Sequence, residues 1–189
     1  MAGSGSLLVL SGPSGVGKTT VARKLMEVPG IVRVMTTTTR ARRPQEVDGR
    51  DYRFLTGTAF EAAIPRGEFL EHARIDGNLY GTPRAAIEKE LASGKLVLVD
   101  IDPQGARSVR QAGLPALFVF IAPPSMAELL QRLEGRKSES PEAVKRRMER
   151  AIRELAEKDS YDVVVVNVTV ERTLEEILAA VRGRGLLKA

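Results

Sequence analysis

The 189-residue sequence has no cysteine and no tryptophan, and it has a single histidine, His72. The absence of cysteine excludes disulfides, thiol catalysis and cysteine-ligated zinc. One histidine excludes histidine-cluster metal sites and argues against a Ser-His-Asp hydrolase. We interpret His72 as a packing or surface residue rather than a catalytic base.

Long apolar segments are also missing. The sequence contains no run of 18 apolar residues, so we expect no membrane-spanning helix. Residues 1–6 lack the basic start and apolar stretch of a signal peptide. These two absences predict a cytoplasmic protein.

The charge balance favours an anionic partner. Basic residues number 29 and acidic residues 24, which gives a net charge of +5. A basic protein of this size can bind nucleic acid, an anionic membrane or a polyanionic small molecule. No nucleic-acid-binding motif occurs, so we expect neither nucleic acid nor membrane as a partner.

Short apolar runs alternate with amphipathic segments along the chain. This alternation predicts an α/β fold in which a parallel sheet carries helices on both faces. Thr82 is expected to cap one of the helices. We predict strands over residues 7–10, 96–99, 117–121 and 161–166, and helices over residues 18–28, 83–92, 125–133, 141–155 and a last one around 174–181.

One segment interrupts the alternation with short strands and a helix near residues 58–64. We interpret it as a small mixed-β lobe, inserted into a single domain that covers residues 1–189. The core is assigned to residues 1–32, 83–131 and 157–189, the lobe to 33–82 and a lid region to 132–156. Residues 134–141 have no apolar side chain and predict a mobile loop within the lid.

Residues 12–19 read GPSGVGKT and fit the phosphate-binding motif G-x-x-x-x-G-K-[ST], or P-loop. The motif follows an apolar strand and opens a helix, which is the context that it requires. Its glycines let backbone N–H groups surround an anion, while Lys18 reaches the terminal phosphates and Thr19 can join a Mg²⁺ shell. The predicted ATP contacts in this loop are Gly12, Pro13, Ser14, Gly15, Val16, Gly17, Lys18, Thr19 and Thr20.

The apolar run at 96–99 ends in Asp100 and Asp102, at the strand edge where open α/β sheets bind ligands. Asp100 can hold the water shell of Mg²⁺ beside a P-loop. A strand-end aspartate can instead cap the next helix, and both interpretations stay open here. Further basic groups follow a hydroxyl run in TTTTRARRP at 36–44, and Tyr52 lies nearby.

The P-loop, TTTTRARRPQEVDGRDY, FLEHARIDGNLYGTP, LVDIDPQGA, RLEGRKSESPEAVKRRM and YDVVVVN occur in this order, and together they resemble the guanylate kinase family over essentially the whole chain. The resemblance implies transfer of a phosphoryl group from MgATP to GMP or dGMP. It places GMP-phosphate ligands at Arg40, Arg43, Tyr52 and Tyr80. It places guanine contacts at Thr36, Glu71, Thr82 and Asp102. It places lid arginines at Arg132, Arg136 and Arg147.

From these assignments we expect Lys18, Arg40, Arg136 and Arg147 to stabilise the transferring group. Arg132 and Arg136 are expected to contact ATP as well, and Thr19 and Asp100 to hold the metal. The chain departs from the family pattern without losing a hydroxyl, carboxylate or arginine that the chemistry requires. The departures are at Thr36, Leu79, Pro103 and Val168.

Three alternatives remain. A guanylate-kinase-like interaction domain that binds phosphopeptides typically lacks an intact P-loop, and this chain has one. A related P-loop kinase for a phosphorylated sugar fits the implied guanine contacts poorly. Nucleic-acid binding would rest on net charge alone. The sequence leaves open whether the protein is a monomer or a homodimer.

Overall fold

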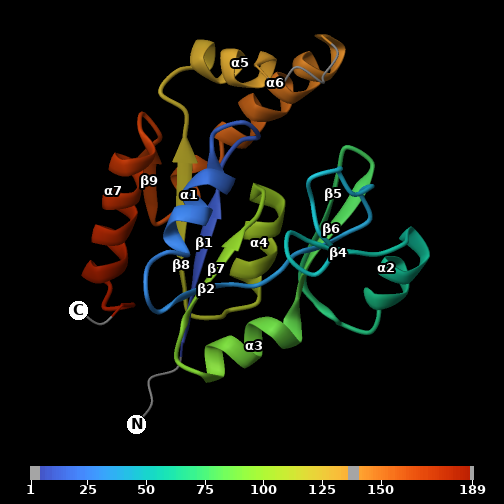
Figure 1. The fold of residues 1–189 in the computed structure, drawn as a ribbon. Coiled ribbons are helices and arrows are strands. Elements are labelled where there is room, and N and C mark those ends of the chain that lie inside the picture. Colours follow the sequence, from blue (N-terminus) through green and yellow to red (C-terminus); the bar gives the residue numbers. More distant parts are fainter. Residues whose placement is uncertain (1–4, 136–140, 188–189) are drawn as a thin grey trace.

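The computed structural model describes residues 5–135 and 141–187, which form two sheets and the helices around them (Figure 1). The larger sheet has five strands, and every neighbouring pair in it is parallel. In spatial order, its strands are β2 (Ile31–Arg33), β7 (Leu96–Asp100), β1 (Ser6–Ser11), β8 (Ala116–Ala122) and β9 (Val163–Val166).

Helices cover both faces of this sheet. The helices α1 (Lys18–Leu25) and α7 (Val170–Gly183) pack on one face against Leu8 and Leu10 of β1. The helices α3 (Arg84–Ala92) and α4 (Pro103–Gln111) pack on the other face against Leu7 and Val9. Successive side chains of a strand point to opposite faces, so a continuous apolar run is buried on both sides. The predicted α/β architecture is confirmed.

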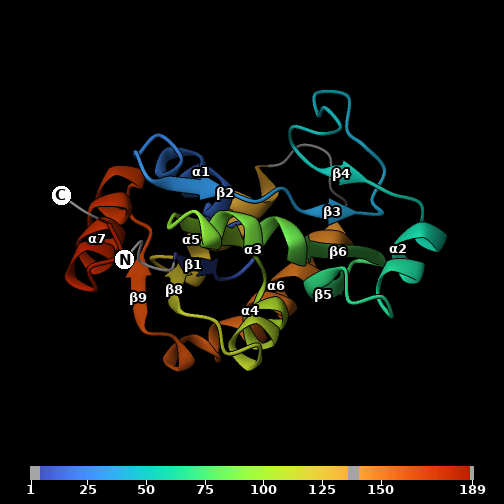
Figure 2. The same ribbon diagram turned by 90° about the horizontal axis from the view of Figure 1, so that it is seen from below.

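The inserted lobe contains the second sheet. Its strands, in spatial order, are β4 (Arg53–Phe54), β3 (Thr37–Thr38), β6 (Asn78–Pro83) and β5 (Phe69–Ile75). The pair β3–β4 is parallel, while β3–β6 and β5–β6 are antiparallel, so the sheet is mixed. The helix α2 (Gly57–Ala63) closes a small core in which Phe60 stacks on Phe69 at 4.3 Å between ring centroids. Figure 2 shows this lobe beside the core sheet.

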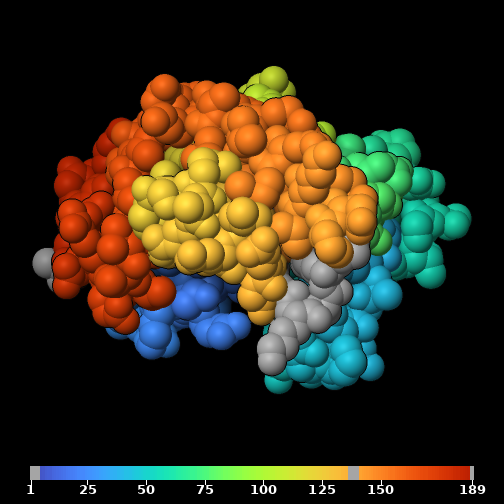
Figure 3. Space-filling view, turned by 90° about the horizontal axis from the view of Figure 1, so that it is seen from above, coloured from blue at the N-terminus to red at the C-terminus, as the bar shows by residue number. Residues whose placement is uncertain are grey.

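Two helices lie over the carboxyl end of the parallel sheet (Figures 1 and 3). They are α5 (Met126–Glu134) and α6 (Pro141–Leu155), and they pack against each other through Leu129, Leu133, Val144 and Ala151. A short 3-10 helix, η1 (Lys158–Ser160), leads from α6 back to the sheet. Most of the predicted loop at 134–141 lies outside the described residues.

Three local predictions differ from the structure. The first core helix ends at Leu25 instead of residue 28. The N–H groups of Glu27 and Val28 bond to the carbonyls three residues earlier, and Pro29 disfavours helical backbone at Val28. Thr82 does not cap α3, because the N-cap of this helix is Pro83. The Thr82 hydroxyl donates a hydrogen bond to Glu71 instead. The last strand begins at Val163, since residues 158–160 form η1.

The core sheet extends to the first residue of the proposed lobe. Arg33, which the sequence assigns to the lobe, is the last residue of β2 and pairs with Leu98 in the core sheet. The proposed boundaries of core, lobe and lid region stay predictions. Among the described residues, no helix is both long enough and apolar enough to cross a membrane.

Candidate active site

The phosphate-binding loop joins β1 to α1 at the carboxyl edge of the parallel sheet. Gly12 has a φ of 137°, and a Cβ there would overlap the carbonyl oxygen of Ile121, so only glycine fits. Gly17 is the N-cap of α1 in left-handed conformation, and no side chain caps this helix. The first N–H groups of α1 are therefore available to an anion.

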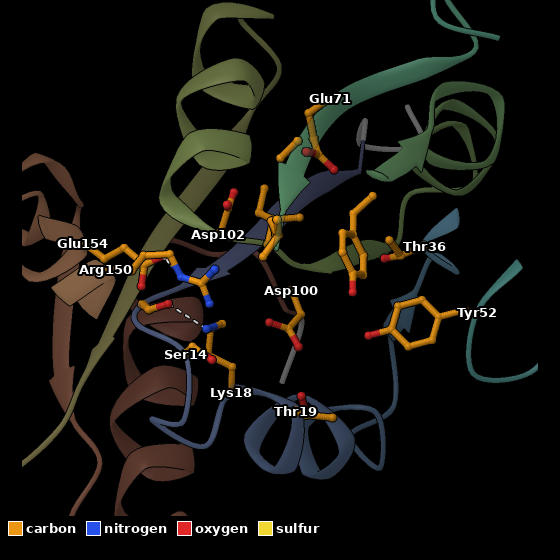
Figure 4. Close-up of a pocket in the computed structure, with 15 residues that line it drawn as sticks. Ser14, Lys18, Thr19, Thr36, Tyr52, Glu71, Asp100, Asp102, Arg150 and Glu154 are labelled. Atoms are coloured by element: carbon orange, nitrogen blue, oxygen red, sulfur yellow. Dashed lines mark hydrogen bonds and ion pairs between the residues drawn. The ribbon is translucent and has the colours of Figure 1, made fainter. Parts of the chain in front are cut away.

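Lys18 extends over this loop. Its ammonium group donates to the carbonyl oxygens of Gly12 and Pro13, at 2.6 and 3.1 Å. Figure 4 shows the ammonium group pointing into the pocket beside Asp100. A cation in this place lies over the anion-binding surface that the loop creates.

Asp100 ends β7 directly beside the loop, since it pairs with Leu10 of β1. Burial raises the pKa of Asp100, while the positive charges of Lys18 and Arg33 and a hydrogen bond from Thr19 oppose this increase. The neighbouring Asp102, and not Asp100, caps α4 by accepting a hydrogen bond from the N–H of Gly105 at 2.8 Å. The capping role that the sequence left open for Asp100 thus falls on Asp102, and the metal role of Asp100 stays a prediction.

Glu71 is the most deeply buried carboxylate of the site, with 5% of the residue exposed. Its Oε1 accepts a hydrogen bond from the Thr82 hydroxyl at 2.5 Å. Burial raises the pKa of Glu71 to about 7, and the negative charge of Asp102 adds to the increase. Desolvation disfavours the charged form of a carboxyl group, so Glu71 is poised between two protonation states near neutral pH.

A basic and aromatic cluster lies on the lobe side. The Arg40 guanidinium is 5.6 Å from the ring centroid of Tyr52, and the rings of Tyr52 and Tyr80 are 6.3 Å apart. Burial raises the pKa of Tyr52. Arg40 also forms an ion pair with Glu46 at 2.7 Å, and Glu46 accepts a hydrogen bond from the N–H of Arg43.

The predicted residues of the two substrate sides meet in one pocket (Figure 4). The phosphate side contributes Gly12, Ser14, Lys18 and Thr19. The lobe side and the strand edge contribute Thr36, Tyr52, Glu71, Tyr80, Asp100 and Asp102. Thr82 lies behind Glu71, while Arg40 and the exposed Arg43 lie outside the lining of this pocket.

The lid arginines differ in their placement. Arg132 donates to the carbonyl oxygens of Val16 and Asn167, at 3.3 and 3.1 Å, and pairs with Glu128. It therefore contacts the loop itself. Arg147 lies on α6 and lines a separate hollow together with Asp76. Arg136 lies outside the described residues.

Sequence reasoning missed Arg150 and Glu154, which line the pocket from α6. Arg150 forms an ion pair with Asp76 at 2.8 Å and lies 3.5 Å from Glu154. Burial raises the pKa of Glu154, while Lys18, Arg150 and the backbone of Ser14 oppose the increase. Their spacing of four residues on one helix was the available signal, but several other charged residues of this helix share the same spacing. The exposed His72 agrees with its interpretation as a surface residue.

Comparisons with known proteins agree with this geometry. The family model described as guanylate kinase matches residues 4–183. The chain is 47% identical over 179 residues to a guanylate kinase of Rubrobacter xylanophilus, with 94% of each chain covered. It is 50% identical over 178 residues to that of Nocardia farcinica, covering 93% of this chain and 92% of the relative.

A solved structure gives the same result. The crystal structure of guanylate kinase from Anaplasma phagocytophilum superimposes with a TM-score of 0.80 at 35% sequence identity, covering 98% of this chain and 88% of that one. The fold of this chain is thus that of a solved guanylate kinase. The chain belongs to the guanylate kinase family.

Proposed function

We propose that this guanylate kinase holds ATP on the loop at 12–19 and GMP against Glu71, with the two phosphate chains meeting beside Lys18. The reaction moves the γ-phosphoryl group of ATP to GMP and yields ADP and GDP. The observation that carries the assignment is the single pocket, which P-loop residues line on one side and Glu71 with the lobe tyrosines on the other.

On the ATP side, backbone N–H groups of the loop and of the first turn of α1 bind the phosphates. Lys18 neutralises charge on the β- and γ-phosphates. Phosphoryl transfer needs little covalent chemistry from the protein, so positioning and charge stabilisation account for most of the catalysis. Arg132 already contacts the loop, and Arg136 and Arg147 of the lid region complete the positive surface in our proposal.

On the GMP side, Arg40, Arg43, Tyr52 and Tyr80 bind the monophosphate. The ion pair between Arg40 and Glu46 orients the guanidinium, and the tyrosine hydroxyls supply hydrogen bonds at the pocket wall. A phosphate of GMP held here faces the γ-phosphate of ATP. Because dGMP carries the same base and phosphate, the proposal extends to it.

The base is chosen by Glu71. Guanine presents two donors on one edge, at N1 and at the 2-amino group, and an ionised carboxylate is an acceptor with two oxygens. Thr36, Thr82 and Asp102 surround the same position and complete a polar wall. Adenine presents an acceptor at N1 and lacks the 2-amino group, so it would leave Glu71 underpaired.

Magnesium is the expected cofactor, and the residues present fit it. Thr19 and Asp100 offer oxygen ligands side by side next to the phosphate loop, and Mg²⁺ prefers oxygen ligands shared with substrate phosphates. When bound, Mg²⁺ supplies charge neutralisation on the phosphates. In the described part of the chain, no group of three acidic, histidine or cysteine side chains is placed to hold a metal ion.

The helix α6 lines the lid side of the pocket with Arg150 and Glu154, and α5 packs against α6. Their closure over the nucleotides would exclude water and so prevent hydrolysis of ATP. Oligomeric state and cytoplasmic location stay predictions. The intact loop favours the enzyme over the phosphopeptide-binding alternative, which has no use for Lys18.

A coupled assay tests the proposal. ATP and Mg²⁺ are combined with GMP, dGMP, AMP, CMP and UMP in turn, and formation of ADP is followed. We expect turnover with GMP and dGMP to exceed turnover with the other monophosphates by orders of magnitude. Equal turnover with AMP, or no turnover with GMP, would refute the assignment.

A further inference from the structure

Gly105 lies in the first turn of α4, where it is buried between the two carboxylates assigned to guanine. Its N–H donates to Oδ1 of Asp102 at 2.8 Å. From the other side, Glu71 reaches across from β5. A Cβ at position 105 would lie 2.6 Å from Oε2 of Glu71 and 3.2 Å from its Cδ.

The backbone does not require glycine at this position. Gly105 lies within a regular helix and is not among the glycines with a positive φ. Glycine within a helix lowers stability relative to alanine. The feature that favours glycine here is therefore space. The carboxylate of Glu71 lies closest to an added methyl, and the Cβ of Ile101 follows at 3.3 Å.

We propose that Gly105 is a specificity-determining positioning residue, whose missing side chain lets the Glu71 carboxylate lie against α4 in the orientation that reads guanine. This inference rests on the proposed function. Two contacts bound the carboxylate: the Thr82 hydroxyl holds Oε1 at 2.5 Å, and the α-carbon face of Gly105 borders Oε2. A methyl group at 105 would push Oε2 away and turn the plane of the carboxylate.

The consequence is confined to the GMP side. The nearest neighbours of an added methyl are Glu71 and Ile101, and neither belongs to the phosphate-binding loop. Displacing a positioning group by about 1 Å can cost on the order of 10²-fold in rate. Gly105→Ala should therefore weaken GMP use while leaving the KM for ATP unchanged.

The kinetic test compares Gly105→Ala with the matched control Gly183→Ala. Gly183 also lies in a helix, α7, but a Cβ there meets no atom within 4 Å. We expect Gly105→Ala to lower kcat/KM for GMP by on the order of 10²-fold, chiefly through KM, and to reduce the GMP-to-AMP ratio. The control should match the wild type. Wild-type GMP kinetics in a folded Gly105→Ala variant would overturn the proposal.

A second measurement does not depend on activity. Thermal unfolding is followed for the wild type, Gly105→Ala, Glu71→Ala and the double variant, as a double-mutant cycle. We expect Gly105→Ala to lower Tm when Glu71 is present and to raise it in the Glu71→Ala background, where the helix gains alanine without a clash. If Gly105→Ala does not fold, we expect the double variant to fold.

A loss of Tm, or of folding, in both backgrounds would assign Gly105 to packing against Ile101 and overturn the proposal. The two hypotheses fail differently. A wild-type enzyme that prefers another monophosphate to GMP would refute the proposed function, and the unfolding cycle would still decide whether Gly105 positions Glu71.

Discussion

Lys18 places an ammonium group at the phosphate-binding loop. Its hydrogen bonds there are to loop carbonyls rather than to the core. We predict that Lys18→Ala abolishes phosphoryl transfer and leaves the fold intact. GDP formation and thermal unfolding are measured on the same preparation. Turnover near the wild-type rate would remove Lys18 from the mechanism.

Glu71 makes the reaction sensitive to pH. Its pKa is about 7 because it is buried, and GMP binding favours the ionised form, which accepts the two guanine N–H bonds. Affinity for GMP should therefore rise as pH rises through about 7. We predict a KM for GMP that falls from about pH 6 to about pH 8 in the wild type.

Glu71→Gln is the control for this titration. The phosphate of GMP titrates in the same range, but it does so equally in both proteins, so only the difference between them reports on Glu71. We expect the variant to bind GMP more weakly and to lose the additional dependence on pH. Parallel pH profiles in the two proteins would contradict the role of Glu71.

The same raised pKa predicts a change in stability. Unfolding returns Glu71 to its ordinary pKa of 4.5, so between pH 4.5 and about 7 the folded state binds more protons than the unfolded state. The contribution of this group to the free energy of unfolding accordingly decreases as pH rises through that window. Relative to Glu71→Gln, the wild type should lose stability over this range.

At the scale of elements, β9 and α7 brace the phosphate-binding loop through Asn167. Its buried side chain donates to the carbonyl oxygen of Val16 at 2.7 Å and accepts from the Thr173 hydroxyl at 3.0 Å. A Cβ at Gly17 would lie 2.5 Å from the Asn167 amide nitrogen, so loop and brace are in close contact. The loop therefore depends on a residue about 150 positions away.

We predict that Asn167→Ala lowers the free energy of unfolding by about 1–3 kcal/mol, because it removes two buried hydrogen bonds, one to the Val16 carbonyl and one from the Thr173 hydroxyl. Denaturant unfolding measures the change. The matched control is Asn78→Ala, whose side chain makes a single exposed hydrogen bond to the carbonyl of Asp76. Equal losses of unfolding free energy in Asn167→Ala and Asn78→Ala would contradict the proposed support of the loop by Asn167.

Elements with strong local signals could be predicted, and contacts between distant segments could not. The helix over 141–155 was predicted with its observed bounds, because Pro141 begins it and apolar residues repeat at helical spacing. Thr82 carried the local signal of a cap, yet a partner on the neighbouring strand uses its hydroxyl. The capping preference of a residue does not reveal a hydrogen-bond partner that lies elsewhere in the sequence.

The same limit applies to the site. The P-loop and the strand-end aspartates were predicted because their chemistry depends on short sequence motifs. The ion pair Arg150–Asp76 joins segments whose pairing follows only from the packing of a lid helix on the lobe. The approach of Glu71 to Gly105 also depends on how β5 packs on α4.

At the scale of the whole molecule, Arg150 connects three parts. It pairs with Asp76 in the hairpin of the lobe and approaches Glu154, which borders the phosphate-binding loop. Asp76 is half-exposed, so its pairing energy is small, whereas Glu154 is largely buried and needs the nearby cation. The contact of Arg150 with Glu154 should therefore contribute more to the free energy of unfolding than its ion pair with Asp76.

We predict that Asp76→Asn changes the free energy of unfolding by about 0–1 kcal/mol and that Arg150→Gln costs clearly more. A double-mutant cycle by urea unfolding measures the coupling between Arg150 and Asp76, and added salt should reduce it. Equal losses for the two single variants would show that Glu154 does not depend on Arg150.

If one pocket joins ATP to a monophosphate chosen by Glu71, base selectivity must depend on this residue. The ratio of kcat/KM for GMP to that for AMP is measured in the wild type and in Glu71→Ala. A site whose buried polar groups match one substrate can reject an analogue by roughly 10⁴-fold or more. We expect such a ratio in the wild type and its collapse in the variant, with GMP activity falling towards the AMP level. An unchanged ratio in Glu71→Ala would contradict the account.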